Sequence, residues 1–322
     1  MSTRTVALLG AALLLAGCGG GGQIGDTGGS GDGKRMVLIP GAAAEPFYIS
    51  MECGFREAAG AKGYAVDVQA PAKFDSTLQT PIVTGVLANK PGAVLIAPTD
   101  DKAMAGPMKQ LKDAGIKVVE VDTKLEDTSV AVSTVSSDNE QGGRLAAQTL
   151  AQLVGDKSGS VLVLNTKAGT STTDARAKGF EDEVVKHPNL RYVGQQYTDN
   201  EPDQAASKLT ATLAANADLI GVFATNLNTG EGASTGLRNA GRTGSVNLVG
   251  FDASPKQVED LRAGVVQALI AQDPATIGRT GAEQAIAALE GGDVKRDIET
   301  NLVAITQADL QAKEKYFYKQ KC

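Results

Sequence analysis

Residues 246–274, VNLVGFDASPKQVEDLRAGVVQALIAQDP, combine two strand patterns with one helix pattern. The first six residues fit a buried strand, a helix pattern follows, and residues 265–271 form a second strand. In an open α/β sheet, ligands bind beyond the carboxyl ends of the strands. Phe251, Asp252 and Gln272 lie at such strand ends, so we consider them candidate ligand-binding residues. By position alone, Phe251 could equally be core and Asp252 a helix N-cap.

Strand and helix patterns alternate along the rest of the chain, from residue 36 to residue 305. Residues 93–96, AVLI, are typical of a strand buried on both faces of a parallel sheet. Ser137, with Glu140 three residues later, predicts the capped start of a helix that runs to about Val154. The strands and helices before and after this point predict an α/β protein of two doubly wound parallel-sheet domains. A chain of 322 residues is long enough for two cores.

Composition and motifs exclude several classes of function. The net charge is −6 and no basic run occurs, which argues against a nucleic acid partner. The single histidine, His187, precedes a proline in a predicted turn, so neither a zinc site nor a hydrolytic triad is expected. Dinucleotide-binding and P-loop glycine motifs are missing at the strand–helix turns. We therefore expect no enzyme activity, no cofactor and no metal.

The amino terminus has the features of a bacterial lipoprotein signal. An apolar run over residues 6–16 follows Arg4 and is too short to span a bilayer. It leads into the sequence LAGC, which looks like a lipobox. We predict a signal peptide over residues 1–17, lipidation of Cys18 and a flexible tether over residues 18–33. An uncleaved signal with a chance cysteine is the alternative. The prediction is an extracytoplasmic protein anchored to the cell membrane.

Two further cysteines remain, Cys53 and Cys322, which is the last residue of the sequence. In an oxidising compartment an even pair favours a disulfide over two free thiols. Such a bridge would hold residues 313–321 against the first helix of the domain.

Seven short motifs carry a resemblance to a known family. They are EPFY (45–48), APTD (97–100), SSDN (136–139), the segment 172–180 with its arginine, FATN (223–226), VGFD (249–252) and IAQDP (270–274). In this order, from about residue 35 to residue 308, the chain resembles a periplasmic sugar-binding protein of the ribose-binding type. The resemblance implies the type I periplasmic binding protein fold, in which a three-strand hinge joins two α/β domains that close over one sugar. It divides this chain into 34–133 with 274–301, and 134–273 with 302–322.

The resemblance also implies a set of ligand-binding residues. Aromatic rings could stack on a sugar, carboxylates accept hydrogen bonds from hydroxyls, and amides and guanidinium groups complete the polar contacts. The candidates are Phe47, Tyr48, Asp122, Ser133, Arg176, Asn226, Phe251, Asp252 and Gln272, with Glu45 and Asp174 in addition.

Three positions depart from the pattern of ribose binders. Glu45 replaces a common amide, and it either caps the first helix or adds a hydrogen-bond acceptor. Thr123 and Asp174 occur where ribose binders carry arginine. These departures favour another neutral monosaccharide or polyol, such as a hexose, a pentose or a cyclitol, over ribose and over acidic sugars.

The predicted function is that of a monomeric solute-binding protein. It would deliver a monosaccharide or polyol to the permease of an ABC importer, which works with an ATPase subunit. The alternative is a receptor subunit that reports the same ligand to a chemosensory or signalling protein. A sugar-responsive transcription regulator shares the fold, but no DNA-binding motif precedes residue 35.

Overall fold

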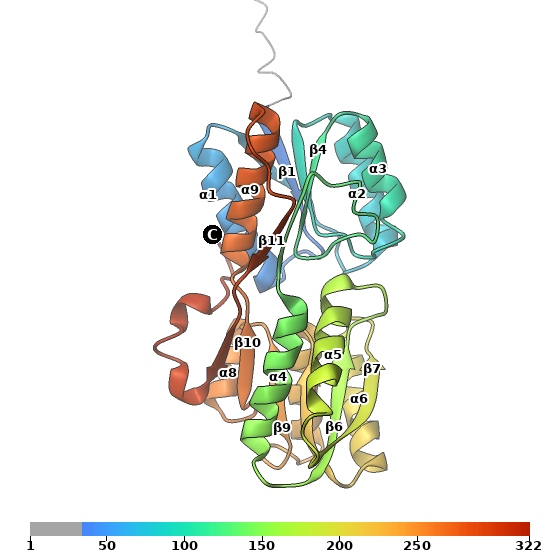
Figure 1. Cartoon of the computed structure of the whole chain (residues 1–322), viewed down its shortest axis with the longest axis vertical. Coiled ribbons are helices and arrows are strands. Elements are labelled where there is room, and N and C mark those ends of the chain that lie inside the picture. Colours follow the sequence, from blue (N-terminus) through green and yellow to red (C-terminus); the bar gives the residue numbers. More distant parts are fainter. Residues whose placement is uncertain (1–33) are drawn as a thin grey trace, which may run out of the picture. The chain divides into compact units, whose positions relative to one another are not determined.

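The computed structural model describes residues 34–322. All of these residues belong to one compact unit. The predicted signal peptide, the lipidation site Cys18 and the tether lie outside these residues. The described chain contains two six-stranded sheets with strand orders β11-β5-β4-β3-β1-β2 and β12-β10-β9-β8-β6-β7. All neighbouring strands are parallel except β10 and β12. The predicted α/β class with two parallel-dominated sheets is confirmed (Figure 1).

The first lobe comprises residues 34–137 and 274–300. Its elements are β1 (Arg35–Ile39), α1 (Pro46–Ala61), β2 (Ala65–Val68), α2 (Ser76–Ala88), β3 (Ala93–Ile96), α3 (Ala105–Asp113), β4 (Lys117–Val121), β5 (Ser133–Ser137), α9 (Pro274–Glu290) and β11 (Asp297–Thr300).

The second lobe comprises residues 138–273 and 301–306. Its elements are α4 (Asn139–Val154), β6 (Gly159–Asn165), α5 (Ser171–Val184), β7 (Leu190–Tyr197), α6 (Pro202–Ala215), β8 (Leu219–Ala224), α7 (Leu227–Asn239), β9 (Asn247–Phe251), α8 (Pro255–Arg262), β10 (Ala268–Ala271) and β12 (Val303–Thr306). A tail follows, residues 307–322, with the short turns η2 (Gln307–Asp309) and η3 (Glu314–Tyr316).

Helices cover both faces of each sheet, which explains the unbroken apolar strands. In β1, Met36 and Leu38 pack into the core that contains α1 and α9, whereas Val37 and Ile39 pack into the core beneath α2 and α3. Because successive side chains of a strand point to opposite faces, a strand buried on both sides must be apolar at every position. The same arrangement places α4 and α5 on one face of the second sheet, with α6 and α7 on the other.

The chain crosses between the lobes at three places: between β5 and α4, between β10 and α9, and between β11 and β12. All five residues of β5 pair with β4 or β11, so the first sheet extends to Ser137 and the division predicted after residue 133 falls inside this strand. The predicted capping box is wrong for the same reason. Ser137 is still a strand residue, and Asp138 caps α4 by accepting a hydrogen bond from the backbone N of Gln141 at 2.9 Å.

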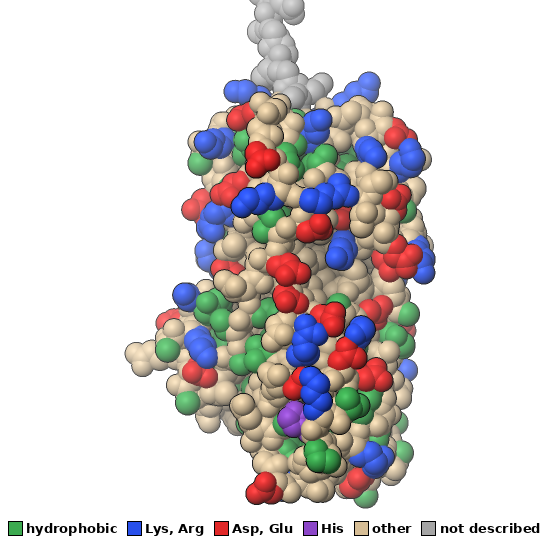
Figure 2. All heavy atoms as spheres, viewed as in Figure 1, with side chains coloured by type: hydrophobic (Ala, Val, Ile, Leu, Met, Phe, Trp, Pro, Cys, Tyr) green, Lys and Arg blue, Asp and Glu red, His purple; other side chains and the backbone are tan. Residues whose placement is uncertain are grey.

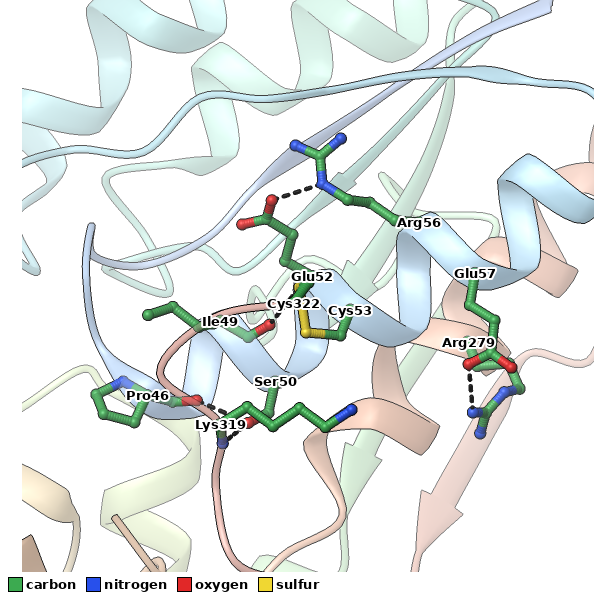
Figure 3. Close-up of a disulfide and its surroundings, with 10 residues drawn as sticks. All are labelled: Pro46, Ile49, Ser50, Glu52, Cys53, Arg56, Glu57, Arg279, Lys319 and Cys322. Atoms are coloured by element: carbon green, nitrogen blue, oxygen red, sulfur yellow. Dashed lines mark hydrogen bonds and ion pairs between the residues drawn. A yellow bond between two sulfur atoms is a disulfide. The ribbon is translucent and has the colours of Figure 1, made fainter. Parts of the chain in front are cut away.

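The predicted disulfide between Cys53 and Cys322 is present, with a Cα–Cα distance of 5.3 Å. It joins α1 to the end of the tail (Figure 3), and the carboxyl terminus accordingly lies beside α1 in Figure 1. None of the described helices combines the length and apolar character of a membrane span. On the face drawn in Figure 2, acidic and basic side chains are interspersed over both lobes without an extended basic field.

Candidate functional site

A small cavity lies between the lobes, where the carboxyl ends of β4, β6, β8, β9 and β10 face each other. The lining residues are Glu45, Phe47, Tyr48, Phe74, Asp122, Thr123, Thr166, Thr170, Thr172, Thr173, Arg176, Asn200, Asn226, Asp252 and Gln272. Eight of the residues expected from the sequence are therefore brought together, from both lobes and from a hinge crossing.

Asp122 and Asp252 occupy equivalent places in the two lobes. Asp122 follows β4 and Asp252 follows β9, and each donates its backbone N–H to the next strand, at 2.9 Å to Val135 O and 2.8 Å to Ile270 O. Both residues adopt the left-handed conformation, with φ of 65° and 79°. Aspartate tolerates this region better than most residues other than glycine.

The carboxylate of Asp252 is held by three donors. Its Oδ1 accepts hydrogen bonds from Gln272 Nε2 and Tyr318 Oη, both at 2.8 Å, and its Oδ2 accepts one from Leu227 N at 2.9 Å. Gln272 is fixed in turn, because its Oε1 accepts from Ser137 Oγ at 2.8 Å. Asp252 is thus the centre of a buried network that spans the second lobe, a hinge crossing and the tail.

Asp252 is not the N-cap of α8. That role belongs to Ser254, whose side chain accepts from Gln257 N and forms a reciprocal capping box with it. The local alternative that the sequence left open for Asp252 is therefore excluded.

The carboxylate of Asp122 has fewer hydrogen-bond donors than that of Asp252. Its Oδ2 accepts one hydrogen bond, from Tyr48 Oη at 3.0 Å, and no residue between 34 and 322 donates to its Oδ1. Burial raises the pKa of Asp122 to about 6, against the lowering effects of Arg176 and of the Tyr48 hydrogen bond, while Asp252 adds to the rise. One carboxylate oxygen is therefore available to a ligand.

Arg176, on α5, is buried with 2% of its surface exposed, so it is not a surface charge. Its Nε donates to Asn139 Oδ1 at 2.8 Å and its Nη1 to Thr225 O at 2.9 Å. The guanidinium carbon lies 3.7 Å from the centroid of the Phe251 ring. Nη2 is buried and has no partner among the described residues. A buried donor without a partner costs ~1–3 kcal/mol, and a ligand oxygen would remove that cost.

The packing of α4 on α5 sets the position of Arg176. A Cβ atom at Gly143 would lie 1.9 Å from Arg176 O, and one at Gly179 would lie 2.0 Å from Glu140 O. Only glycine allows the two backbones to approach this closely. Arg176 therefore comes from a helix held by backbone contact and not from a mobile surface element.

Glu45 immediately precedes α1, and its side chain makes no capping hydrogen bond. The residue lines the cavity, so the capping role is excluded and the role of an added hydrogen-bond acceptor stays a prediction. Burial raises the pKa of Glu45 to about 8, with further contributions from Asp252, Asp122 and Glu231. At neutral pH this carboxyl group is largely protonated and can both donate and accept a hydrogen bond.

Three aromatic rings border the cavity. Phe47 and Tyr48, at the start of α1, are in edge contact with a centroid distance of 5.1 Å, and Phe74 comes from the loop before α2. Asn226 lines the cavity while capping α7: its Oδ1 accepts from Thr229 N at 3.0 Å, and its Nδ2 donates to Asn200 Oδ1 at 2.7 Å.

Three of the expected residues lie outside the lining. Phe251 is fully buried beneath Arg176. Ser133 is the first residue of β5 and therefore lies at the opposite end of the strand from the cavity. Its Oγ donates to Lys295 O at 2.7 Å. Asp174 accepts hydrogen bonds from Asn165 Nδ2 and Gly169 N, both at 2.9 Å, and so fixes the loop before α5. In the structure Asp174 stabilises this loop and does not line the cavity.

The cavity also contains residues that the sequence reasoning missed. Thr123, noted in the sequence only as a departure from ribose binders, and the threonines of the 166–173 segment follow strand ends, so the strand-end rule could have found them as lining residues. Asn200 likewise follows the end of β7 by three residues. Phe74 gives no such signal, and neither does Tyr318, which is not a lining residue but contacts Asp252 and Gln272. Within residues 34–322 no group of three His, Cys, Asp or Glu side chains is arranged to hold a metal ion.

Comparisons with known proteins agree with this architecture. A family model described as a periplasmic binding protein domain matches residues 36–293. The ribose import binding protein of Salmonella typhimurium is 31% identical over 271 residues, which cover 83% of this chain and 88% of the relative.

Two solved structures of ABC transporter solute-binding proteins from Agrobacterium vitis are also similar. One, bound with α-D-tagatopyranose, is 39% identical with a TM-score of 0.86 and covers 88% of this chain and 99% of its own. The other, with bound D-fucose, is 27% identical with a TM-score of 0.82 and covers 88% and 100%. The resemblance inferred from the seven motifs is confirmed. The chain belongs to the periplasmic binding protein family and, within it, to the ribose-binding type.

Proposed function

We propose that this protein binds one neutral monosaccharide in the cavity between its lobes. The observation that carries the proposal is a pair of open hydrogen-bonding atoms on opposite lobes, Asp122 Oδ1 and Arg176 Nη2, at one cavity. A sugar hydroxyl can donate to the first and accept from the second, and a charged partner makes each bond about twice as strong as a neutral one. Phe47 and Phe74 supply apolar surface for the C–H face of a ring.

The charges at the cavity favour a neutral ligand over an acidic one. Asp122 and Asp252 both line the cavity, together with the largely protonated Glu45, whereas Arg176 is the only cationic side chain in the lining. A sugar carboxylate would therefore meet more negative than positive groups. The tagatopyranose-bound and fucose-bound neighbours make neutral hexoses the first ligands to test, with pentoses and cyclitols next.

We propose that the lobes close over the ligand by bending at the three crossings. Three contacts join the lobes around the cavity: an ion pair between Lys73 Nζ and Glu201 Oε1 at 2.6 Å, and hydrogen bonds from Asp101 N to Gly169 O at 3.1 Å and from Lys124 N to Ser171 Oγ at 3.0 Å. These contacts favour the closed arrangement, and opening would break them and bend the chain at the crossings, while the tail still connects the lobes.

The relatives are binding proteins of sugar import and not enzymes, in agreement with the expectation of a non-catalytic role. We propose that the closed protein presents its sugar to an ABC permease and its ATPase subunit, and that lipidated Cys18 keeps it, as a monomer, at the outer face of the membrane. The family's periplasmic setting supports export. No contact among the described residues favours the alternative of a sensing subunit.

A thermal-shift screen of the mature protein against neutral hexoses, pentoses, cyclitols and uronic acids tests the proposal. A true ligand at 100 times its Kd should add about 2.7 kcal/mol to the free energy of unfolding. Isothermal titration then gives the Kd and a stoichiometry of one. No stabilisation by any neutral sugar, or tightest binding to a uronic acid, would contradict the proposal.

A further inference from the structure

The tail, residues 307–322, connects the second lobe to the first beyond the region that matches the family model, which ends at residue 293. Tyr318 N donates to Ala253 O at 3.0 Å in the loop after β9. Lys319 N donates to Ser50 Oγ at 2.7 Å on α1, and three residues later Cys322 is bonded to Cys53, also on α1 (Figure 3). The last five residues thus pass directly from one lobe to the other.

Tyr318 touches three proposed ligand-binding residues. Its Oη donates to Asp252 Oδ1 at 2.8 Å and accepts from Gln272 N at 3.2 Å, and its ring meets the edge of Phe47 at a centroid distance of 5.7 Å. The side chain is buried, with 5% exposed. Burial and the neighbouring Asp252 raise the pKa of Tyr318 well above its usual value, so the phenol remains a donor at every physiological pH.

We propose that Tyr318 is a positioning residue of the ligand site and that the Cys53–Cys322 disulfide holds it in place. This inference rests on the proposed function, because Tyr318 acts through Asp252 and Gln272. Asp252 Oδ1 is shared by the phenol and by the Gln272 amide. Loss of the phenol leaves Gln272 Nε2 as the remaining donor to Oδ1 and Leu227 N as the donor to Oδ2, so the carboxylate is held less firmly in the orientation that a sugar hydroxyl requires.

The disulfide matters because little else holds the end of the tail. Residues 319–322 are all exposed, and the Lys319–Ser50 hydrogen bond is the backbone contact that attaches them to α1. Chain termini fray unless they are tied down. The disulfide therefore keeps Tyr318 inserted between the lobes. Both Tyr318 and Cys322 lie beyond residue 293, where the match to the family model ends.

The experiment compares sugar affinity in Tyr318→Phe and wild-type protein, with Tyr316→Phe as the matched control. Tyr316 lies in the same tail, is half-buried and lines no part of the cavity. Tyr318→Phe keeps the ring and its contact with Phe47, so we expect the unliganded melting temperature to change by no more than a few degrees. The Kd for the best sugar of the screen should rise about tenfold, whereas Tyr316→Phe should bind as the wild type does.

Deoxy analogues of that sugar distinguish positioning from a purely structural role. The analogue that lacks the hydroxyl bound by Asp252 should lose less than about twofold on Tyr318→Phe, because the contact that Tyr318 orients is already missing. A residue that only stabilised the fold would weaken every analogue by the same factor, and that result would overturn the proposal.

The Cys53→Ser/Cys322→Ser double variant tests the anchor, measured well below its lowered melting temperature. We expect its Kd to rise toward that of Tyr318→Phe, and the addition of Tyr318→Phe to cost much less than it does in the wild type. Wild-type affinity in the serine variant overturns the role of the disulfide. Wild-type affinity in Tyr318→Phe overturns the inference and leaves the proposed function intact, whereas wild-type protein that binds no sugar overturns both.

Discussion

Asp122 and Asp252 occupy equivalent positions in the two lobes, but their carboxylates have different numbers of hydrogen-bond partners. Each aspartate follows the fourth strand of its lobe in chain order in a left-handed conformation, and each has a carboxylate at the cavity. Asp252 accepts three hydrogen bonds from its own surroundings, whereas Asp122 accepts one. Equivalent backbone positions therefore supply a carboxylate that the protein itself orients on one side and a carboxylate with an open oxygen on the other. The number of partners, and not the position, separates the two roles.

The largest effect should follow from Asp252→Asn. An amide retains the backbone conformation, but its NH2 group must face one of the donors Gln272, Tyr318 or Leu227. We expect the free energy of unfolding to fall by ~3 kcal/mol, together with a loss of sugar binding. Urea unfolding measures the first and titration calorimetry the second. Unchanged stability would mean that the network around Asp252 contributes nothing to the fold.

Asp122→Asn should behave in the opposite way with respect to stability. The folded-state pKa of Asp122, about 6, is above its usual value of 3.8, so the folded protein binds the proton more tightly than the unfolded chain. Stability is therefore lost as the pH rises from about 4 to 6, and Asn removes that loss. At pH 7 the unliganded variant should be more stable by ~1–2 kcal/mol.

The same substitution should weaken sugar binding by ~30–100-fold, because a charged acceptor is replaced by an amide. In the wild type the Kd should rise about tenfold per pH unit below 6, as Asp122 takes up its proton. Asp122→Asn should lose this pH dependence. A pH profile that is the same in both proteins would show that Asp122 does not contact the sugar.

Glu45→Gln should give a smaller gain of stability over a wider pH range. The pKa of Glu45 is raised from 4.5 to about 8 on folding, so wild-type stability falls progressively between these pH values and is level above them. Since the residue is partly exposed, we expect the variant to gain only ~1 kcal/mol at pH 8. Melting curves at pH 4.5 and pH 8 measure the difference, which should vanish at the lower pH.

Lys73→Ala should have the smallest effect. The Lys73–Glu201 pair joins the lobes, but its side chains are 67% and 41% exposed. Exposed ion pairs contribute ~0–1 kcal/mol and are screened by salt. We expect a Kd increase of less than about fivefold, mostly in the dissociation rate, that disappears at high ionic strength. A larger, salt-independent effect would show that this contact is a principal element of closure.

Local pattern predicts the fold of this protein well and its site in part. Asp122, Asp252 and Gln272 could be found because each follows a strand, and parallel strands all end at one edge of the sheet. The same rule does not apply to Phe251. It is still a strand residue, one position before Asp252, and its side chain points into the core beneath α4.

Other errors come from properties that a linear pattern does not contain. Asp174 and Arg176 lie two positions apart on one helix, so only one of them can face the cavity. Ser133 belongs to the correct strand but to its wrong end. Tyr318 contacts Asp252 and Gln272 from a tail that is attached by a disulfide with a sequence separation of 269, which no local pattern encodes.

The Cys53–Cys322 bond also turns almost the whole described chain into a covalent ring. A protease that cuts one exposed loop between these residues leaves a nicked but undivided molecule, because both pieces remain attached through the bond. Release of a fragment requires a second cut or a reductant. A protein of a family that works outside the cytoplasm can therefore keep its fold after a single cleavage, as long as the two lobes remain packed.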